Sequence, residues 1–286
     1  MNRSSSPSRF SGRRSGFTLI ELLVAFTLLG IIGLSILRTF TSQARLADLH
    51  TKQLDARTVS RAPINLFMSE ARMVETGNGV VAASASSVTL RVPVVMGIVC
   101  GTTGAATVLS LMPVDSAILA SAAISGHAYR QTNGVYIYTE GATTISSGGD
   151  GICNGASASI APVNGGQRVL VTPQMAGATV GSVAFIYQRV RYDFAPSTTL
   201  AGRVGLWRTL EASGATEELA APFDASSRFR FYRNDQDASD ATVPLLSEIR
   251  GLELELVGAS ERARLGRVTP ETSRLQTAVF FMNRIN

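Results

Sequence analysis

The sequence predicts an α+β protein, in which a long N-terminal helix packs against a C-terminal antiparallel β-sheet domain. Three observations lead to this prediction. Residues 17–37 are an apolar stretch with a single charge, and residues 38–76 repeat apolar side chains every three or four positions. Residues 77–286 alternate apolar and polar side chains in short runs separated by Gly- and Ser-rich stretches.

Residues 1–16 are polar and basic, and we expect them to be a cytoplasmic leader. They hold four of the 26 basic residues and no acid, which leaves 22 basic residues against 21 acidic ones in the rest of the chain. Most of the net charge of +5 therefore lies in this short segment. A nucleic-acid-binding surface needs Lys and Arg clustered on a folded face. We therefore expect no nucleic acid partner.

Residues 17–37 are expected to form a transmembrane helix. Twenty-one residues of helix span about 30 Å, the thickness of the hydrocarbon core of a bilayer. A secretory signal peptide would have a shorter apolar core, of roughly 7–15 residues. An acid inside a membrane helix costs roughly 2.5–3.5 kcal/mol, so Glu21 predicts a functional role. Four basic residues precede the segment and three follow it closely, which favours a cytoplasmic N-terminus.

Residues 38–76 are expected to continue as an amphipathic helix outside the membrane. Pro63 should kink this helix or begin a second one, and the Gly77-Asn78-Gly79 sequence should end it. The apolar face is the expected contact with the sheet domain, and its residues are Leu46, Leu49, Leu54, Ile64, Phe67, Met68 and Val74.

The remainder of the chain is expected to be β-rich. Asn133-Gly134 predicts a hairpin turn. In the run 252–256, Leu and Glu alternate, so we expect the Leu side chains to face the core and Glu253 and Glu255 to face solvent. Three Ser-, Gly- and Ala-rich stretches are expected to be surface loops: 82–87, 141–166 and 211–221. The predicted strands are 88–95, 107–112, 135–139, 168–172, 180–194, 203–210, 228–233, 248–257 and 275–285.

Cys100 and Cys153 are the two cysteines of the chain. Their spacing fits neither a CxxC redox motif nor a zinc site. In an oxidising compartment we expect them to form a disulfide, which would contribute about 4 kcal/mol by the chain-entropy model. Two free buried thiols are the alternative.

Few residues point to a cofactor or to catalysis. Asp235, Asp237, Ser239 and Asp240 resemble the start of a calcium loop, but the glycine and the closing Glu of an EF-hand are missing, so an exposed acidic turn is the expectation. His127 has no neighbouring nucleophile motif. We therefore expect no metal or other cofactor and no enzymatic activity, with a membrane-anchored periplasmic enzyme as the alternative.

The string from Arg13 to Leu23, RRSGFTLIELL, resembles the leader and cleavage site of type IV pilins and type II secretion pseudopilins. The resemblance implies that a prepilin peptidase cuts between Gly16 and Phe17 and methylates the new N-terminal amine of Phe17. It also implies that Glu21 pairs with such an amine on a neighbouring subunit and so sets the register of a filament. Many major pilins carry a proline where this sequence has Arg38, which favours a minor subunit.

Residues 185–286 are similar, as a succession of strands, to minor pseudopilin J of type II secretion and to PilW-type minor pilins. The segments that carry this resemblance are VRYDF, GLWRTL, RFRFYRND, IRGLELELV and VFFMNRIN. The resemblance implies a subunit at the tip of a filament, which initiates assembly together with I- and K-type subunits. It also implies a single-pass precursor in the bacterial inner membrane with a periplasmic C-terminal domain. A PilW-like initiator of type IV pili, serving adhesion, motility or DNA uptake, is the alternative.

Overall fold

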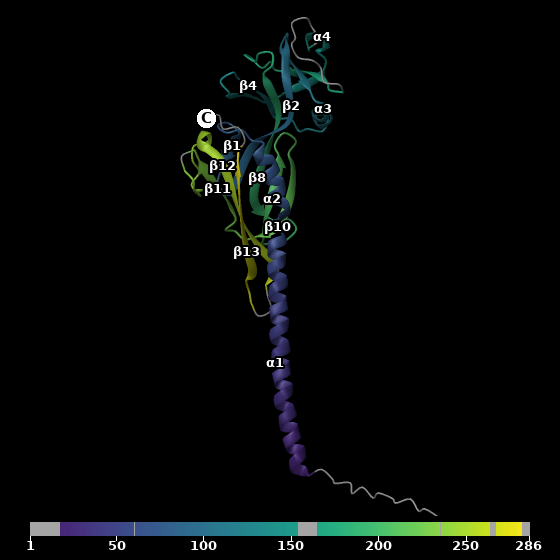
Figure 1. The fold of residues 1–286 in the computed structure, drawn as a ribbon, viewed down its shortest axis with the longest axis vertical. Coiled ribbons are helices and arrows are strands. Elements are labelled where there is room, and N and C mark those ends of the chain that lie inside the picture. The colour runs from purple at the N-terminus through teal and green to yellow at the C-terminus, as the bar shows by residue number, and fades with distance from the viewer. Residues whose placement is uncertain (1–17, 60, 154–164, 235, 264–266, 282–286) are drawn as a thin grey trace, which may run out of the picture. The chain divides into compact units, whose positions relative to one another are not determined.

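The computed structural model describes residues 18–59, 61–153, 165–234, 236–263 and 267–281. It confirms the α+β class, because two N-terminal helices precede a large antiparallel sheet (Figure 1). The chain divides into two compact units, Met1–His50 and Thr51–Asn286. The second unit contains the whole sheet.

The N-terminal helices are α1 (Leu19–Thr58) and α2 (Arg61–Arg72). Pro63 was predicted either to kink the helix or to begin a second one, and in the structure a second helix begins beside it. Pro63 is the third residue of α2, in the first turn, where a missing N–H costs no helical hydrogen bond. The helix ends at Arg72 rather than at the predicted residue 76, and Gly77 adopts a positive φ of 101° in the turn that follows.

Within the described residues the sheet has 13 strands, and its main path runs in the order β11-β12-β10-β9-β8-β2-β3-β7-β6. β1 pairs with β2, β13 with β12, and β4 with both β5 and β8. Two short helices, α3 (Pro113–Leu119) and α4 (Asp150–Cys153), lie between strands. The strands are β1 (Val80–Ala83), β2 (Ser87–Thr103), β3 (Ala106–Leu111), β4 (Gly126–Arg130), β5 (Tyr136–Glu140), β6 (Thr144–Ser147), β7 (Arg168–Thr172), β8 (Val183–Pro196), β9 (Val204–Leu210), β10 (Ala215–Phe223), β11 (Arg228–Arg233), β12 (Ile249–Ala263) and β13 (Pro270–Phe280).

The long strands β2 and β8 pair along most of their length and run through two lobes (Figure 1). The helix lobe contains α2, β1, β9 to β13 and the adjoining halves of β2 and β8, and its core is the largest apolar cluster. The hairpin lobe, residues 93–187, contains α3, α4 and β3 to β7 with the other halves of β2 and β8. Separate apolar clusters fill the hairpin lobe.

The predicted contact between the amphipathic helix and the sheet is made by α2. Phe67 is fully buried, and its ring lies edge-on to Tyr192 of β8 with 5.1 Å between the ring centroids. It also contacts Phe229 of β11 at 5.8 Å. Leu54, which was expected on the same packing face, is instead 58% exposed. The periodic pattern thus identified an apolar stripe, of which the part in α2 and Val74 just after it enter the core.

A buried ion pair also joins α2 to the sheet. Arg208 of β9 places Nη2 2.6 Å from Oε1 of Glu70, and the Tyr192 hydroxyl donates to Oε2 of Glu70 at 2.5 Å. Arg208 binds Glu217 of β10 as well, at 3.0 Å. Burial, and next the Glu70 carboxylate, raise the pKa of Tyr192, so this hydroxyl remains a donor at neutral pH. The Arg208 guanidinium and the Tyr192 hydroxyl thus both donate hydrogen bonds to the Glu70 carboxylate.

All three predicted loops contain strand residues, because the stretch 82–87 includes the end of β1, which was not predicted, and the first residue of β2. Residues 211–221 include most of β10, which pairs with β9 from Ala215 opposite Leu210 onward. Residues 141–166 include β6, paired with β7. β4 was not predicted either, although the Asn133-Gly134 turn that follows it is confirmed by the β4–β5 hairpin. The side chains of these strands give no alternating pattern, although β10 forms a hairpin with the preceding strand β9 and β4 forms one with the following strand β5.

The prediction for the alternating run in β12 is confirmed for the Leu side chains and wrong for the Glu side chains. Leu252, Leu254 and Leu256 are fully buried, as predicted. The prediction that both Glu side chains face solvent is wrong: Glu255 is only 2% exposed, and the Glu253 side chain is 12% exposed and lies 3.6 Å from Arg230 of β11. The Glu255 carboxylate lies between Arg228 of β11 at 3.1 Å and Arg274 of β13 at 2.6 Å. The partner arginines come from strands on both sides of β12, a proximity that the local pattern does not reveal.

We predict that the Glu70–Arg208 pair reports on helix docking. Glu70→Leu should lower the free energy of unfolding by about 3 kcal/mol, because it leaves Arg208 charged in a largely buried position. The double variant Glu70→Leu/Arg208→Leu should lose less than Glu70→Leu alone, since no guanidinium is then left in this position with only the exposed Glu217 as its partner. Urea unfolding of the full chain in detergent micelles measures these differences.

Arg191→Leu is the matched control, because Arg191 pairs with Asp193 at 3.0 Å in a more exposed position. We expect a change below about 1 kcal/mol for this variant. A loss for Glu70→Leu as small as that of the control would contradict the docking role.

Candidate processing and assembly site

The predicted functional residues are concentrated where the chain enters α1. Gly16 and Phe17, the expected cleavage and methylation positions, lie outside the described residues. Thr18 is the first described residue, α1 begins at Leu19, and Glu21 lies in the first turn of the helix. The structure therefore describes the helical side of the site.

Thr18 and Glu21 form a reciprocal hydrogen-bonded pair at this helix start. The Thr18 backbone N–H donates to Oε2 of Glu21 at 2.9 Å, and the Thr18 hydroxyl donates to the same oxygen at 3.1 Å. In return, the Glu21 backbone N–H donates to Oγ1 of Thr18 at 3.3 Å. This is a capping box, in which two N–H groups that lack helical partners are satisfied by side chains three residues apart.

The capping box was not anticipated, although its signal is present in the sequence. A Thr followed three residues later by a Glu at the start of an apolar run is the pattern that predicts it. Glu21 therefore has a local role in starting α1, besides any role between subunits. Among the described residues both Thr18 bonds go to Oε2, so Oε1 of Glu21 is left for a further donor.

The segment that follows has the properties of a membrane helix. Among the described residues, one helix is long and apolar enough to cross a bilayer, and no residue of its apolar window is buried. The polar side chains within it are satisfied locally. Thr27 donates to the carbonyl oxygen of Val24 at 2.8 Å, and Ser35 donates to that of Ile31 at 3.0 Å. Apart from Glu21, this segment thus needs no polar partner from outside the helix.

Cys100 and Cys153 are joined by a disulfide in the structure. It links β2 to α4 within the hairpin lobe, and both residues belong to a small buried cluster with Val108. The alternative of two free thiols therefore does not apply to this fold. The cross-link closes a segment with a sequence separation of 53 residues, which the chain-entropy model values at about 4 kcal/mol.

The calcium candidates bind protein partners where they are described. Asp235 lies outside the described residues. Asp237 is paired with Arg250 at 3.2 Å, and Asp240 accepts a hydrogen bond from the Thr242 backbone N–H at 2.9 Å. That N–H lowers the pKa of Asp240. Among the described residues no group of three potential metal ligands was found.

His127 is the buried titratable group that an enzymatic alternative would first invoke. Its Nδ1 lies 3.1 Å from the Thr143 hydroxyl, and Nε2 is buried with no hydrogen-bond partner in the described part of the chain. Burial lowers the pKa of His127 to about 4, so the ring is neutral at pH 7. The ring lies in β4, remote in sequence from the N-terminal site.

Comparison with known families gives one match, to the N-terminal segment. The family described as the prokaryotic N-terminal methylation motif matches residues 11–37. Neither the curated proteins nor the solved structures gave a match. The chain therefore carries a prepilin-type methylation motif followed by an apolar helix, consistent with a type IV pilin-like protein that is anchored in a membrane.

Proposed function

We propose that the chain is a minor pseudopilin, a structural subunit that acts in the tip or initiation complex of a type II secretion pseudopilus. The observation that carries this proposal is the methylation motif at residues 11–37 leading into an apolar helix. A filament subunit needs both parts, since the motif directs processing and the apolar helix packs in the filament core. The proposed role is structural, with no catalysis and no resident cofactor.

Processing would convert the precursor into the assembly-competent form. We propose that a prepilin peptidase cuts after Gly16 and methylates Phe17, with the leader in the cytoplasm and the sheet domain in the periplasm. The new amine would then be cationic at the N-terminus of a helix, where the helix dipole disfavours positive charge. A carboxylate close to this amine offsets that penalty, and Glu21 supplies one a single turn away.

Assembly would bring the amine of one subunit to Glu21 of its neighbour. Glu21 caps its own helix through Oε2, which leaves Oε1 for a donor from another chain. A carboxylate in hydrocarbon is costly unless it is paired, so subunits in the correct register are favoured over others. The side chain thus fixes where α1 begins and, in this proposal, which register neighbouring helices adopt.

The minor-subunit assignment is supported by the sheet domain and by Arg38. Four of the five segments that resemble minor pseudopilin J fall on β8, β9, β11 and β12, and the fifth begins in β13 and runs past the described residues. Arg38 lies within the continuous helix α1, where many major pilins have a proline. I- and K-type subunits are the proposed neighbours at the tip. A PilW-like initiator of type IV pili has the same features and is the second candidate.

We predict that Glu21→Ala leaves membrane insertion and cleavage largely intact but prevents incorporation into filaments. Glu21→Gln separates the two roles of the side chain, because glutamine can also accept the capping hydrogen bonds but carries no charge. We expect both variants to fail in assembly if the charge is what the neighbour requires. Sheared filament fractions, probed for this subunit, measure incorporation.

Thr18→Val is the matched control for the cap, since it removes the hydroxyl and leaves the charge of Glu21 in place. We expect this variant to assemble better than Glu21→Gln. Wild-type incorporation of Glu21→Ala would contradict the proposal, and wild-type incorporation of Glu21→Gln would assign the residue to helix capping alone.

We predict that deletion of the gene abolishes type II secretion and leaves twitching motility intact. The physical reason is that a tip complex is needed only by the filament that it starts. Activity of a secreted enzyme in the culture medium and spreading beneath agar measure the two outcomes in one strain. Loss of twitching with normal secretion would replace the pseudopilus assignment by the PilW-like one.

A further inference from the structure

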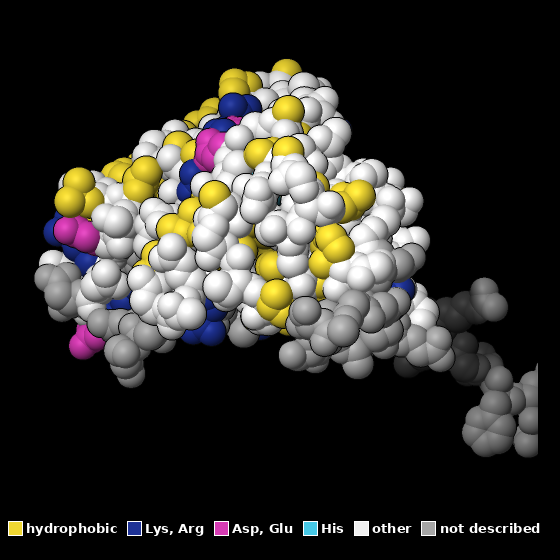
Figure 2. Space-filling model, turned by 90° about the horizontal axis from the view of Figure 1, so that it is seen from above, with side chains coloured by type: hydrophobic (Ala, Val, Ile, Leu, Met, Phe, Trp, Pro, Cys, Tyr) yellow, Lys and Arg dark blue, Asp and Glu magenta, His cyan; other side chains and the backbone are white. Residues whose placement is uncertain are grey.

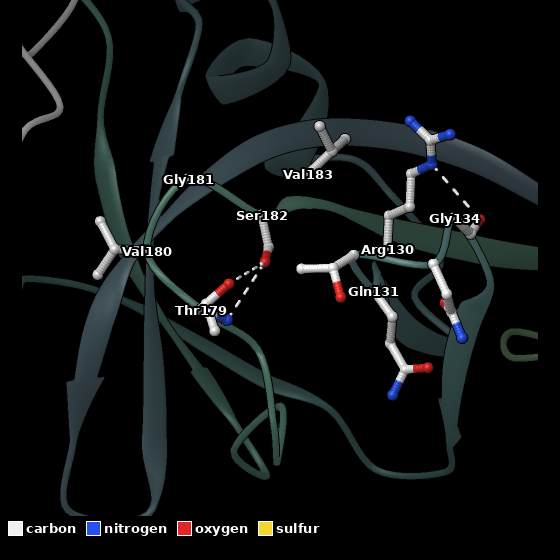
Figure 3. A pocket seen from close by; sticks show the side chains of 10 residues that line it. Arg130, Gln131, Gly134, Thr179, Val180, Gly181, Ser182 and Val183 are labelled. Atoms are coloured by element: carbon white, nitrogen blue, oxygen red, sulfur yellow. Dashed lines mark hydrogen bonds between the residues drawn. The ribbon is translucent and has the colours of Figure 1, made fainter.

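A pocket of about 480 Å³ lies in the hairpin lobe (Figure 3). One wall is the turn of the β4–β5 hairpin, residues 130–134, and the facing wall is the segment 179–183 that leads into β8. Small organic ligands are usually held in pockets of about 300–1,000 Å³. The pocket is therefore large enough to hold one or more sugar rings.

Both walls are held in shape by their own hydrogen bonds. In the hairpin, the Gln131 backbone N–H donates to the Val135 carbonyl at 2.8 Å, and the Val135 N–H donates to Oδ1 of Asn133 at 3.0 Å. In the facing segment, the Ser182 N–H donates to the Thr179 carbonyl at 3.0 Å, and the Thr179 N–H donates to the Ser182 hydroxyl at 3.2 Å. Walls that are already ordered reduce the entropy cost of binding a ligand.

The lining combines neutral polar side chains and two valines with one cation. Arg130 is the charged residue among those that line the pocket, and no acid lines it. Hydroxyl and amide groups donate as well as accept hydrogen bonds, which matches the hydroxyls of a sugar. Val180, which is 50% exposed, adds apolar surface for the C–H face of a ring. The hydroxyl and amide side chains are those of Gln131, Thr132, Asn133, Thr179 and Ser182.

The surrounding lobe is poor in charge. Five charged residues occur between positions 93 and 187, although the chain has 26 basic and 21 acidic residues in all. Figure 2 looks down on this end of the sheet domain, where charged side chains are sparse in the centre of the view and hydrophobic side chains are scattered among neutral groups. Because few charged residues surround the pocket, the Arg130 guanidinium is the main source of charge within it. The five charged residues are Asp115, Arg130, Glu140, Asp150 and Arg168.

Arg130 is placed to use this charge on a ligand. The residue is exposed, and its Nε donates to the Gly134 carbonyl at 3.4 Å, which directs the guanidinium along the hairpin (Figure 3). Among the described residues no acidic side chain pairs with it, so both terminal nitrogens are left for a ligand. The two parallel N–H groups of a guanidinium match the two oxygens of a carboxylate.

We propose that this pocket binds an acidic glycan, with Arg130 on the carboxylate of a uronic acid residue and the hydroxyl and amide side chains on the sugar hydroxyls. A neutral sugar would offer the guanidinium hydroxyl acceptors but no opposite charge. A phosphate group carries up to two negative charges, which a single cation balances less well. The proposal stands on the pocket alone and holds whichever filament the subunit belongs to.

The test is a calorimetric titration of the full chain in a detergent that has no sugar headgroup. The probes are trimers of galacturonate and of glucuronate, a galactose trimer, and the peptide Ala-Ala-Ala with a free C-terminal carboxylate. We expect saturable binding of a uronate trimer and weaker binding of the other two probes. Arg130→Gln should weaken uronate binding about 10- to 100-fold, because it removes the hydrogen bonds between the charged guanidinium and the carboxylate.

Arg191→Gln in β8 is the matched control, since it removes an arginine that does not line the pocket. We expect unchanged affinity for this variant, and thermal unfolding of both variants checks that the fold is retained. Arg130→Lys should recover only part of the affinity, because an ammonium lacks the guanidinium fork. The proposal is overturned if no uronate trimer binds, if the galactose trimer or the peptide binds as tightly, or if Arg130→Gln binds like the wild type.

Discussion

The docking of α2 on the sheet is the interaction on which the rest of the structure depends. Phe67 and Glu70 lie three residues apart and therefore on one face of α2, and they contact the same region of the sheet. Phe67 buries an aromatic ring beside Tyr192, while Glu70 binds the Tyr192 hydroxyl and the Arg208 guanidinium. The apolar contact removes the Phe67 ring from water, and the ion pair favours the position of α2 that satisfies the charge of Glu70.

The two ends of the helical region use acidic residues for different purposes. Glu70 is enclosed by donors from the sheet, whereas Glu21 has only Thr18 within the described residues. An acid that is fully satisfied inside the chain has a structural role. Oε1 of Glu21 can accept a further donor, and this contrast is consistent with the intersubunit role proposed for Glu21.

The sequence predicted the features that depend on neighbours along the chain. The apolar helix, the second helix near Pro63, the hairpin turn at Asn133-Gly134 and the buried face of β12 all follow from local spacing. Features made by distant segments were missed. Glu255 is buried because Arg228 and Arg274 lie on the neighbouring strands. β10 was missed for a different reason: it forms a hairpin with the preceding strand β9, but its Ala- and Glu-rich sequence does not alternate apolar and polar residues. At the candidate site, the capping box was readable from the Thr18–Glu21 spacing but was overlooked.

The central claim is that the precursor is processed at the start of α1, and the intact mass of the protein tests it most directly. Co-expression with a prepilin peptidase should remove residues 1–16 and add one methyl group to the new N-terminus at Phe17. Expression without the peptidase should give the full-length mass. An unchanged mass in the presence of an active peptidase, or a cut elsewhere in the chain, would contradict the account.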